Sequence, residues 1–546
     1  MAPSPPSPNH AFPLPRALPW LAVLALPLLL LAFTRVGVVD DAYISFRYAR
    51  NLVSGRGYAF NPGDPVEGAT NLLWTLLMAV PIGLGLPEHL AAAALGLAFG
   101  LLAAVQGWRL ARALGAGERA AFLALATLGL CPDFWLMATN GLAGGLYAAL
   151  LTQTLLAAVT GASPAVVGVW ATLLFATRPD AVGLLPLLGI YLAAVPVRGP
   201  APGPPPARRL ATFAAVLVAG IGALTMWRFV YFGAALPNSI AAKSVLGLMS
   251  PTHGPTAWWR GLQLIRPSGP VDVLTLNLKG GVRYVLDFVV ATLPLSAGAV
   301  LAPVLRPRRA GVWLGAAASA AGAAVAVANG GDWMPAHRLI APYLPVMAAL
   351  LAVAIDAVAG RVDRWAPSAR RAAQAAGAAA LAAAVVVMGV RNQPRDNTGG
   401  WRATPALEVS APASCYASMG RVFEAALPPD AVAASLVAGV FGYELRGHVV
   451  HDMLGLTDRY LAEHGGLYWP TLGRSDFAYT YDRVRPAVTV LHRSGLPPGA
   501  VPAGDGYRTF AHTAGGCNEL VLLRADLADA LLPLLAPLHL EPVTPP

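Results

Sequence analysis

The chain reads VVDDAYISFRYAR at residues 38–50, directly after its first hydrophobic run. A carboxylate pair beside a membrane segment is costly unless it is solvated, paired or used. Asp40 and Arg47 are seven residues apart, which places them on one face of a helix, two turns apart. A carboxylate takes a proton from a hydroxyl, and a guanidinium holds a phosphate through two bonds. The alternative is an interfacial salt bridge that anchors the loop.

The composition around this stretch is that of a polytopic membrane protein. Of 546 residues, 56% are hydrophobic and 12% are charged, and the mean hydropathy is +0.57. Soluble domains carry about 25% charged residues. The formal net charge of +10 does not indicate nucleic acid binding, because the arginines occupy short loops between hydrophobic runs.

About 20 apolar residues cross a bilayer, and this rule predicts about eleven transmembrane helices. They are expected near 17–36, 89–108, 119–132, 142–160, 164–178, 181–196, 210–230, 282–304, 310–328, 339–358 and 372–390. The apolar stretch 70–86 is a twelfth span or an interfacial helix. The run beginning at residue 17 is interpreted as an uncleaved helix, since no small-residue cleavage site follows it.

Arginine-rich loops predict the orientation. By the positive-inside rule, four such loops face the cytoplasm. They hold Arg109, Arg112 and Arg119; Arg198, Arg208 and Arg209; Arg306, Arg308 and Arg309; and Arg361, Arg364, Arg370 and Arg371. A disordered N-terminus at 1–16 is then cytoplasmic, the membrane domain is 17–390, and its first outer loop is 37–88.

The composition of the chain changes after residue 390. Residues 391–546 are mixed and polar, with strand-like runs at 431–440 and 487–491 and helical runs at 456–464 and 527–535. This pattern predicts a soluble α/β domain on the extracytoplasmic side. Cys415 and Cys517 both fall in it, and an oxidising compartment would permit a disulfide between them.

Polar side chains gather in the outward loops. Glu67 and Asn71 either bind a sugar hydroxyl or cap the loop, and Lys243 either contacts a phosphate or is solvated. Residues 330–338 read GGDWMPAHR, whose Trp333 either stacks on a sugar or belongs to the interfacial aromatic belt. His337 has no second histidine at ligand spacing, so no metal site is predicted. The sequence contains no Walker A, His-Glu-x-x-His or Gly-x-Ser-x-Gly motif, and an ATP-driven reaction is therefore not expected.

Several of these motifs together resemble a known family. DDAYISFRYA at 40–49, FNPG at 60–63, VEG at 66–68 and TNLLW at 70–74 resemble the start of the polyprenyl-phosphate-dependent GT-C glycosyltransferases. The likeness is strongest to the terminal β-(1→2) arabinofuranosyltransferase (AftB-like) group. It continues in RPD at 178–180, LPNS at 236–239, GGDWM at 330–334 and DMLGLTD at 452–458.

The resemblance implies an all-α GT-C bundle with a catalytic cavity on its outer face and a C-terminal domain that helps bind the acceptor. Asp40 or Asp41 would be the catalytic base. Donor phosphate contacts would be Arg47, Lys243 and Arg338. Sugar or acceptor contacts would be Glu67, Asn71, Asp180, Asn238, Asp332, Trp333 and His337. No cofactor is expected, and dependence on a divalent metal stays open.

The expected activity is inverting transfer of a sugar from polyprenyl phosphate to an extracytoplasmic glycan or protein, in a bacterial cytoplasmic membrane. By analogy with the family, the transferred sugar is arabinofuranose or another pentose, and a hexose is the open alternative. Relatives carry a glutamate after Gly-Leu or Gly-Met, whereas this chain has Ala143 there. The missing acid keeps a catalytically inactive glycan-binding scaffold as an alternative. A lipid-linked-sugar flippase is a second alternative, which would need polar groups at mid-membrane depth and internal repeats.

Overall fold

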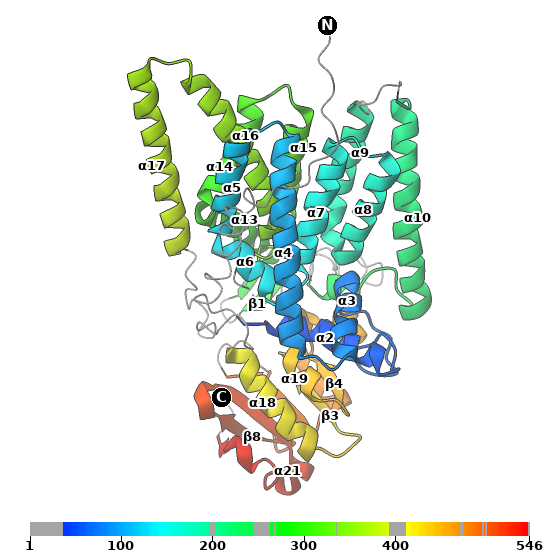
Figure 1. Cartoon of the computed structure of the whole chain (residues 1–546). Helices are drawn as coiled ribbons and strands as arrows, with labels where there is room; N and C mark the ends of the chain where they lie inside the picture. The colour runs from blue at the N-terminus through cyan, green and yellow to red at the C-terminus, as the bar shows by residue number, and fades with distance from the viewer. Residues whose placement is uncertain are drawn as a thin grey trace.

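The structure is a computed structural model in which a helical bundle stands on a smaller α/β region (Figure 1). It describes residues 37–195, 203–243, 263–266, 269–332, 334, 336–391, 411–469, 473–493, 496 and 499–543. The N-terminal segment 1–16, the expected first span 17–36 and Trp333 lie outside the described residues.

The bundle is built from helices that follow one another along the chain. They are α2 (Asp40–Val53), α3 (Leu72–Gly83), α4 (Glu88–Ala113), α5 (Glu118–Gly129), α6 (Pro132–Thr139), α7 (Gly144–Val159), α8 (Pro164–Thr177), the 3-10 helix η2 (Pro179–Leu184), α9 (Leu185–Ala194), α10 (Pro206–Phe232), α11 (Asn238–Lys243), α13 (Val273–Ala291), α14 (Leu293–Leu305), α15 (Ala310–Ala328), α16 (Leu344–Val362) and α17 (Pro367–Arg391).

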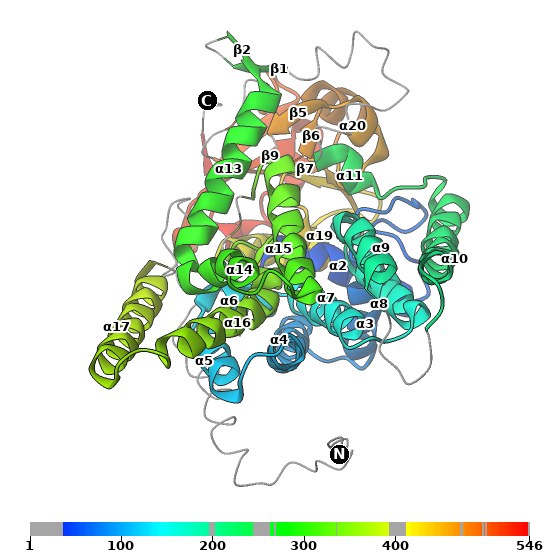
Figure 2. The ribbon, with the colours of Figure 1, turned by 90° about the horizontal axis from the view of Figure 1, so that it is seen from above.

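The chain is a multi-pass membrane protein, although the predicted count of eleven spans is not confirmed. Among the described residues, five helices are long and apolar enough to cross, or up to seven if two bent helix pairs each form one span. The predicted spans 142–160, 164–178 and 181–196 appear as shorter apolar helices. The helix α7 is short but buried along nearly its whole length, so neighbouring helices rather than lipid surround it. By contrast, α10 and α17 lie on opposite flanks of the bundle and bury few residues (Figure 2).

The described residues of the four arginine-rich connections lie at the end of the bundle opposite the C-terminal region (Figure 1). Three of them also contact one another. Arg306 pairs with Asp356 at 3.2 Å, Gly117 donates its backbone N–H to the same carboxylate at 3.0 Å, and Arg309 donates to the Leu114 carbonyl. The loops that the positive-inside rule groups together are therefore on one side of the molecule.

The C-terminal region contains a six-stranded mixed sheet in the order β10-β8-β9-β7-β3-β4. The central strand β7 (Val488–His492) runs parallel to β3 (Val432–Ser435) and antiparallel to β9 (Glu519–Arg524), with Val488 opposite Leu523. The other strands are β4 (Val449–Asp452), β8 (Tyr507–His512) and β10 (Glu541–Pro542), and the helices are α18 (Ala411–Ala426), α19 (Gly439–Glu444), α20 (Arg459–His464) and α21 (Ala525–Leu531).

The C-terminal region differs from the sequence expectation in one element and contains the expected disulfide. The run 431–440, expected as one strand, is the strand β3 followed by the start of α19 at Gly439. Cys415 and Cys517 form a disulfide with their Cα atoms 5.9 Å apart, which ties α18 to the segment before β9.

The helix α2 lies between the bundle and the C-terminal region (Figure 1). Its first turn carries Asp40 and Asp41 and its last turn carries Arg50, which matches the helix dipole at both ends. Nearly all of its middle is buried, because α3 packs on one side and α19 on another. Two adjacent residues of α2 point about 100° apart, so neighbouring side chains reach different parts of the molecule.

Candidate functional site

A cavity of about 520 Å³ lies at this boundary, where α2, α11, α15 and the turns before α7 and α9 meet. Six charged side chains line it: Asp41, Asp180, Asp332, Arg178, Lys243 and Arg338. Ser45, Asn71, Asn140 and Asn329 add neutral polar groups, and Ile44, Leu142, Val182 and Leu339 add apolar wall. A second cavity, of about 580 Å³, is lined by α9, α10 and Ala235 and has no charged residue in its wall.

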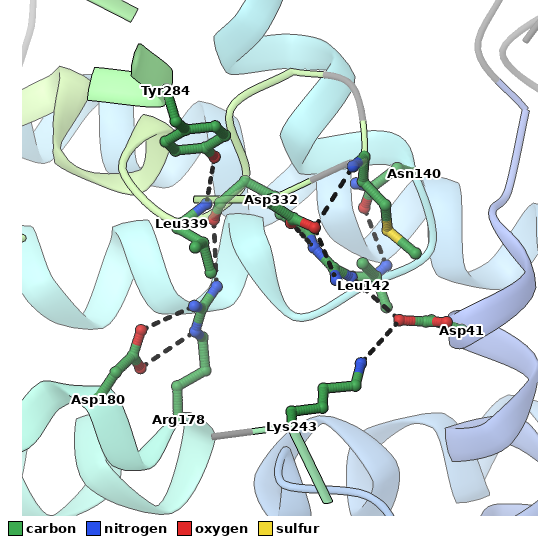
Figure 3. Close-up of polar contacts among 11 residues, drawn as sticks. Asp41, Asn140, Leu142, Arg178, Asp180, Lys243, Tyr284, Asp332 and Leu339 are labelled. Atoms are coloured by element: carbon green, nitrogen blue, oxygen red, sulfur yellow. Dashed lines mark hydrogen bonds and ion pairs between the residues drawn. The ribbon is translucent and has the colours of Figure 1, made fainter. Parts of the chain in front are cut away.

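Asp41 reaches two cations in the first cavity (Figure 3). Its Oδ2 atom lies 3.3 Å from Arg338 Nη1 and 3.6 Å from Lys243 Nζ. Burial alone would raise the pKa of Asp41, but Lys243 and Arg338 outweigh it and hold that pKa below its usual value. Asp41 is therefore ionised at neutral pH.

The remaining charges form pairs in the same wall. Arg178 binds Asp180 through two hydrogen bonds of 3.1 and 2.7 Å. Arg338 binds Asp332 and so bridges two carboxylates, and Arg178 also donates to the Arg338 carbonyl at 3.1 Å. Figure 3 shows these contacts among the labelled residues Asp41, Arg178, Asp180 and Asp332 and their partners. Three carboxylates balance three cations in its wall.

Asp40 faces the C-terminal region instead. Its carboxylate accepts hydrogen bonds from the backbone N–H groups of Gly439 at 3.1 Å and Val440 at 2.7 Å, at the start of α19. Burial raises the pKa of Asp40 to about 7, and the negative charge of Asp41 adds to the rise while these two N–H donors oppose it. Of the two aspartates proposed as the base, the structure brings only Asp41 to the cavity.

The structure places Arg47, which was expected to contact the donor phosphate, away from the cavity. Its side chain is 1% exposed and is absent from the cavity wall. The guanidinium donates to the carbonyls of Phe60, Leu445 and His448 at 2.7 to 3.0 Å, and to that of Gly442. Arg47 is thus occupied by the backbone near the end of α19, on the same face of α2 as Asp40.

Glu67 and Asn238 are also occupied elsewhere. Glu67 forms an ion pair with Arg228 of α10 at 2.8 Å, and both side chains are 2% exposed. Asn238 donates to the carbonyls of Gly455 and Asp458 at 2.9 and 3.0 Å. These contacts hold the loops that carry Glu67 and Asn238 against α10 and the C-terminal region, and neither side chain lines the cavity.

His337 likewise points away from the cavity wall and pairs with Asp133 at 2.6 Å. Among the residues that the sequence analysis selected as ligand contacts, the cavity wall contains Asn71, Asp180, Asp332, Lys243 and Arg338. Within the described residues, no group of three or more His, Cys, Asp or Glu side chains is placed to hold a metal ion.

Sequence reasoning missed Arg178 as a site residue. The sequence does carry a signal for Arg178, because the charged residues of Arg178-Pro179-Asp180 stand between two apolar runs. Asn140 was missed as well. It lines the cavity, its backbone carbonyl accepts from Val39 N–H at 3.0 Å, and its side chain accepts from Leu142 N–H at 3.0 Å.

Known proteins match most of this chain in fold and parts of it in sequence. Residues 407–527 match the family described as a domain of unknown function (DUF8728). A stretch of 145 residues is 37% identical to the terminal beta-(1->2)-arabinofuranosyltransferase of Mycobacterium tuberculosis, and covers 24% of this chain and 23% of that protein. The match thus spans about a quarter of the length of this relative.

Two solved structures superpose on most of the chain. ArnT from Cupriavidus metallidurans bound to undecaprenyl phosphate has a TM-score of 0.54 at 14% identity, over 93% of this chain and 97% of that one. The archaeal oligosaccharyltransferase AglB from Archaeoglobus fulgidus, in complex with an inhibitory peptide and a dolichol-phosphate, has a TM-score of 0.51 at 12% identity, over 92% and 74%. The chain therefore has the GT-C fold expected from the sequence.

Proposed function

We propose that this chain is a membrane glycosyltransferase that moves a sugar from a polyprenyl-phosphate donor to an extracytoplasmic acceptor, with inversion at the anomeric carbon. The observation that carries the proposal is Asp41, an ionised carboxylate 3.3 and 3.6 Å from two cations in a cavity of about 520 Å³. Cavities of a few hundred Å³ accommodate small ligands, and a sugar phosphate is of that class. The shared fold with lipid-phosphate-bound structures supports the donor class.

In this mechanism Asp41 is the general base. It takes the proton of an acceptor hydroxyl while the oxygen attacks the anomeric carbon. The bond between that carbon and the phosphate oxygen breaks, and the polyprenyl phosphate leaves with the electron pair. Lys243 and Arg338 stabilise the negative charge that develops on the phosphate. A single carboxylate is sufficient, because a phosphate leaving group needs no proton.

Because Asp41 is paired with Lys243 and Arg338 in the free enzyme, donor binding also changes the pKa of Asp41. Lys243 and Arg338 hold the pKa of Asp41 low, which makes Asp41 a weak base. A donor phosphate competes with Asp41 for these two cations. When they turn to the phosphate, the pKa of Asp41 rises, and the carboxylate becomes a better proton acceptor at the moment the donor is bound.

The side of the membrane follows from the charge pattern. The arginine-rich loops lie opposite the C-terminal region, and the positive-inside rule assigns them to the cytoplasm (Figure 1). We therefore place the cavity and the C-terminal region outside the cytoplasmic membrane of a bacterium, with the N-terminus inside. The acceptor is then a cell-envelope glycan or a secreted protein. A pentose such as arabinofuranose is the sugar that the sequence match favours.

One observation favours a second candidate, a glycan-binding scaffold without catalysis. Ala143 lines the cavity, so the acid that the family carries there is missing from the cavity itself. The two candidates share the binding site and differ only in turnover.

The test is sugar transfer by the purified full chain in nanodiscs. The donors are radiolabelled decaprenyl-phosphoryl-arabinose and a panel of other decaprenyl-phosphoryl pentoses and hexoses, and the acceptor is an arabinan oligosaccharide. The proposal predicts transfer from one donor class and a product of opposite anomeric configuration. Binding of a donor without turnover would support the scaffold. Retention of configuration would refute the single-displacement mechanism.

A further inference from the structure

The turn that carries Arg338 into the cavity is held in an unfavourable backbone conformation. Ala336 and His337, the two residues before it, have φ angles of 66° and 44°. Both are in the left-handed region, which costs about 1–3 kcal/mol for a residue with a side chain. Such a conformation persists only where surrounding contacts impose it, so the contacts of His337 need explanation.

His337 is fixed on several sides. Its Nδ1 atom lies 2.6 Å from Asp133 Oδ2, and its ring packs edge-on against Tyr284 and Phe288, with ring centres 5.2 and 5.6 Å away. Its carbonyl accepts hydrogen bonds from Ile340 and Ala341 at 2.9 Å each, which begins the helical segment leading to α16.

Asp133 lies on α6, a helix that borders the cavity, although Asp133 itself is not part of the cavity wall. Its side chain is 5% exposed, and it lies in the first turn of α6. The same short helix carries Met137 and ends before Asn140, and both of these line the cavity. The Asp133–His337 contact therefore joins α6 to the turn that supplies Arg338.

We propose that Asp133 and His337 are a positioning pair, which holds the strained turn so that Arg338 reaches Asp41 and the donor phosphate. This inference rests on the proposed function and adds two residues to it that touch neither substrate nor reacting atoms. Loss of the pair lets Ala336 and His337 relax to ordinary φ angles and swings Arg338 out of place. A displacement of about 1 Å at such a site costs about 100-fold in rate.

Two substitutions of His337 separate its roles. His337→Asn keeps a hydrogen-bond donor near the Nδ1 position, and asparagine tolerates the left-handed conformation. His337→Leu loses both. We expect kcat/KM for the donor to stay within about 3-fold in the first variant and to fall about 10- to 100-fold in the second.

A matched control exists in the C-terminal region. His451 is a buried histidine that contacts Asp458 at 3.2 Å and Thr480 at 3.0 Å, outside the cavity. His451→Leu removes a similar pair without a path to Arg338. It is expected to lower the melting temperature and to leave the donor KM unchanged.

The deciding experiment is a double-mutant cycle of Asp133→Asn and Arg338→Gln. In the unmodified background, Asp133→Asn is expected to lower kcat/KM about 10-fold, mainly through the donor KM. In the Arg338→Gln background it is expected to have no further effect, because the residue it positions is gone. Equal losses in both backgrounds would overturn the inference.

Melting temperatures of the same four proteins, measured without substrate, provide a readout independent of turnover. If the unmodified protein transfers no sugar, the proposed function fails, and these temperatures then decide the inference alone. Non-additive shifts for Asp133→Asn and Arg338→Gln would uphold the pair as the support of Arg338. Additive shifts would overturn it.

Discussion

Replacing Arg47 with methionine tests whether α2 clamps the C-terminal region. The substitution keeps a long apolar stem and removes every donor. The backbone carbonyls of Gly442, Leu445 and His448 then lose their donor, while that of Phe60 keeps a hydrogen bond of 3.0 Å from Asn51. A buried acceptor without a donor costs about 1–3 kcal/mol, and part of this is recovered by relaxation. We expect the free energy of unfolding to fall by about 3–5 kcal/mol, near the upper limit for single substitutions.

The assay combines the melting temperature with hydrogen exchange at the amides of Gly439 and Val440, which Asp40 binds. Arg47→Met is expected to lower the first and speed the second. Arg56→Met is the matched control, because Arg56 also reaches the C-terminal region, through one exposed bond of 2.8 Å to the Arg446 carbonyl. Its effect is expected to stay within about 0.5 kcal/mol.

The opposite pattern would refute the clamp. If Arg47→Met leaves the melting temperature and amide exchange unchanged but abolishes binding of decaprenyl phosphate, Arg47 is a phosphate contact after all.

A buried ion pair, a buried carboxyl group and a disulfide each give a further prediction. Glu67→Gln leaves Arg228 buried without its countercharge, so the free energy of unfolding is expected to fall by about 3–5 kcal/mol, measured by thermal melting; an unchanged melting temperature would contradict the buried pair. Because the pKa of Asp40 is raised to about 7 from its ordinary value of 3.8, its proton uptake stabilises the fold at low pH, and this contribution is lost as pH rises through about 7. The melting temperature should therefore fall as pH rises from about 4 to about 7, and Asp40→Asn should remove this part of the pH dependence. Reduction of the disulfide between Cys415 and Cys517 is expected to cost about 2–5 kcal/mol, seen as a lower melting temperature in dithiothreitol, while a double serine variant should show no response to the reductant.

The pair Asp40 and Asp41 shows which features of the site can be predicted from the sequence and which cannot. Its position after an apolar run identified the important helix, and the seven-residue spacing correctly placed Asp40 and Arg47 on one face. That face packs against α19, however, and Asp41, one residue on, points to the cavity. Which face of a helix meets a site depends on what packs around it, and here the partner lies about 400 residues away along the chain.

The outer loops show the same limit. From the sequence alone, a polar residue in a loop near the membrane surface could either bind a ligand or pair with another residue of the chain. Lys243 and Arg338 line the cavity, whereas Glu67 meets Arg228, a partner inside an apolar helix that the charge pattern assigned no role. Long-range pairing of this kind leaves no local signature. The order of the motifs pointed to the GT-C fold, whereas hydropathy did not yield the number of spans, because several apolar runs form short or bent helices.

The central claim is that Asp41 is the base, and one measurement tests it most directly. Asp41→Asn and Asp40→Asn are compared for single-turnover transfer from saturating decaprenyl-phosphoryl sugar, with donor binding and melting temperature measured alongside. We predict that Asp41→Asn binds donor but transfers at least about 100-fold more slowly, in the range of a lost general base. Asp40→Asn should keep its turnover. Full transfer by Asp41→Asn, with loss confined to Asp40→Asn, would contradict the account.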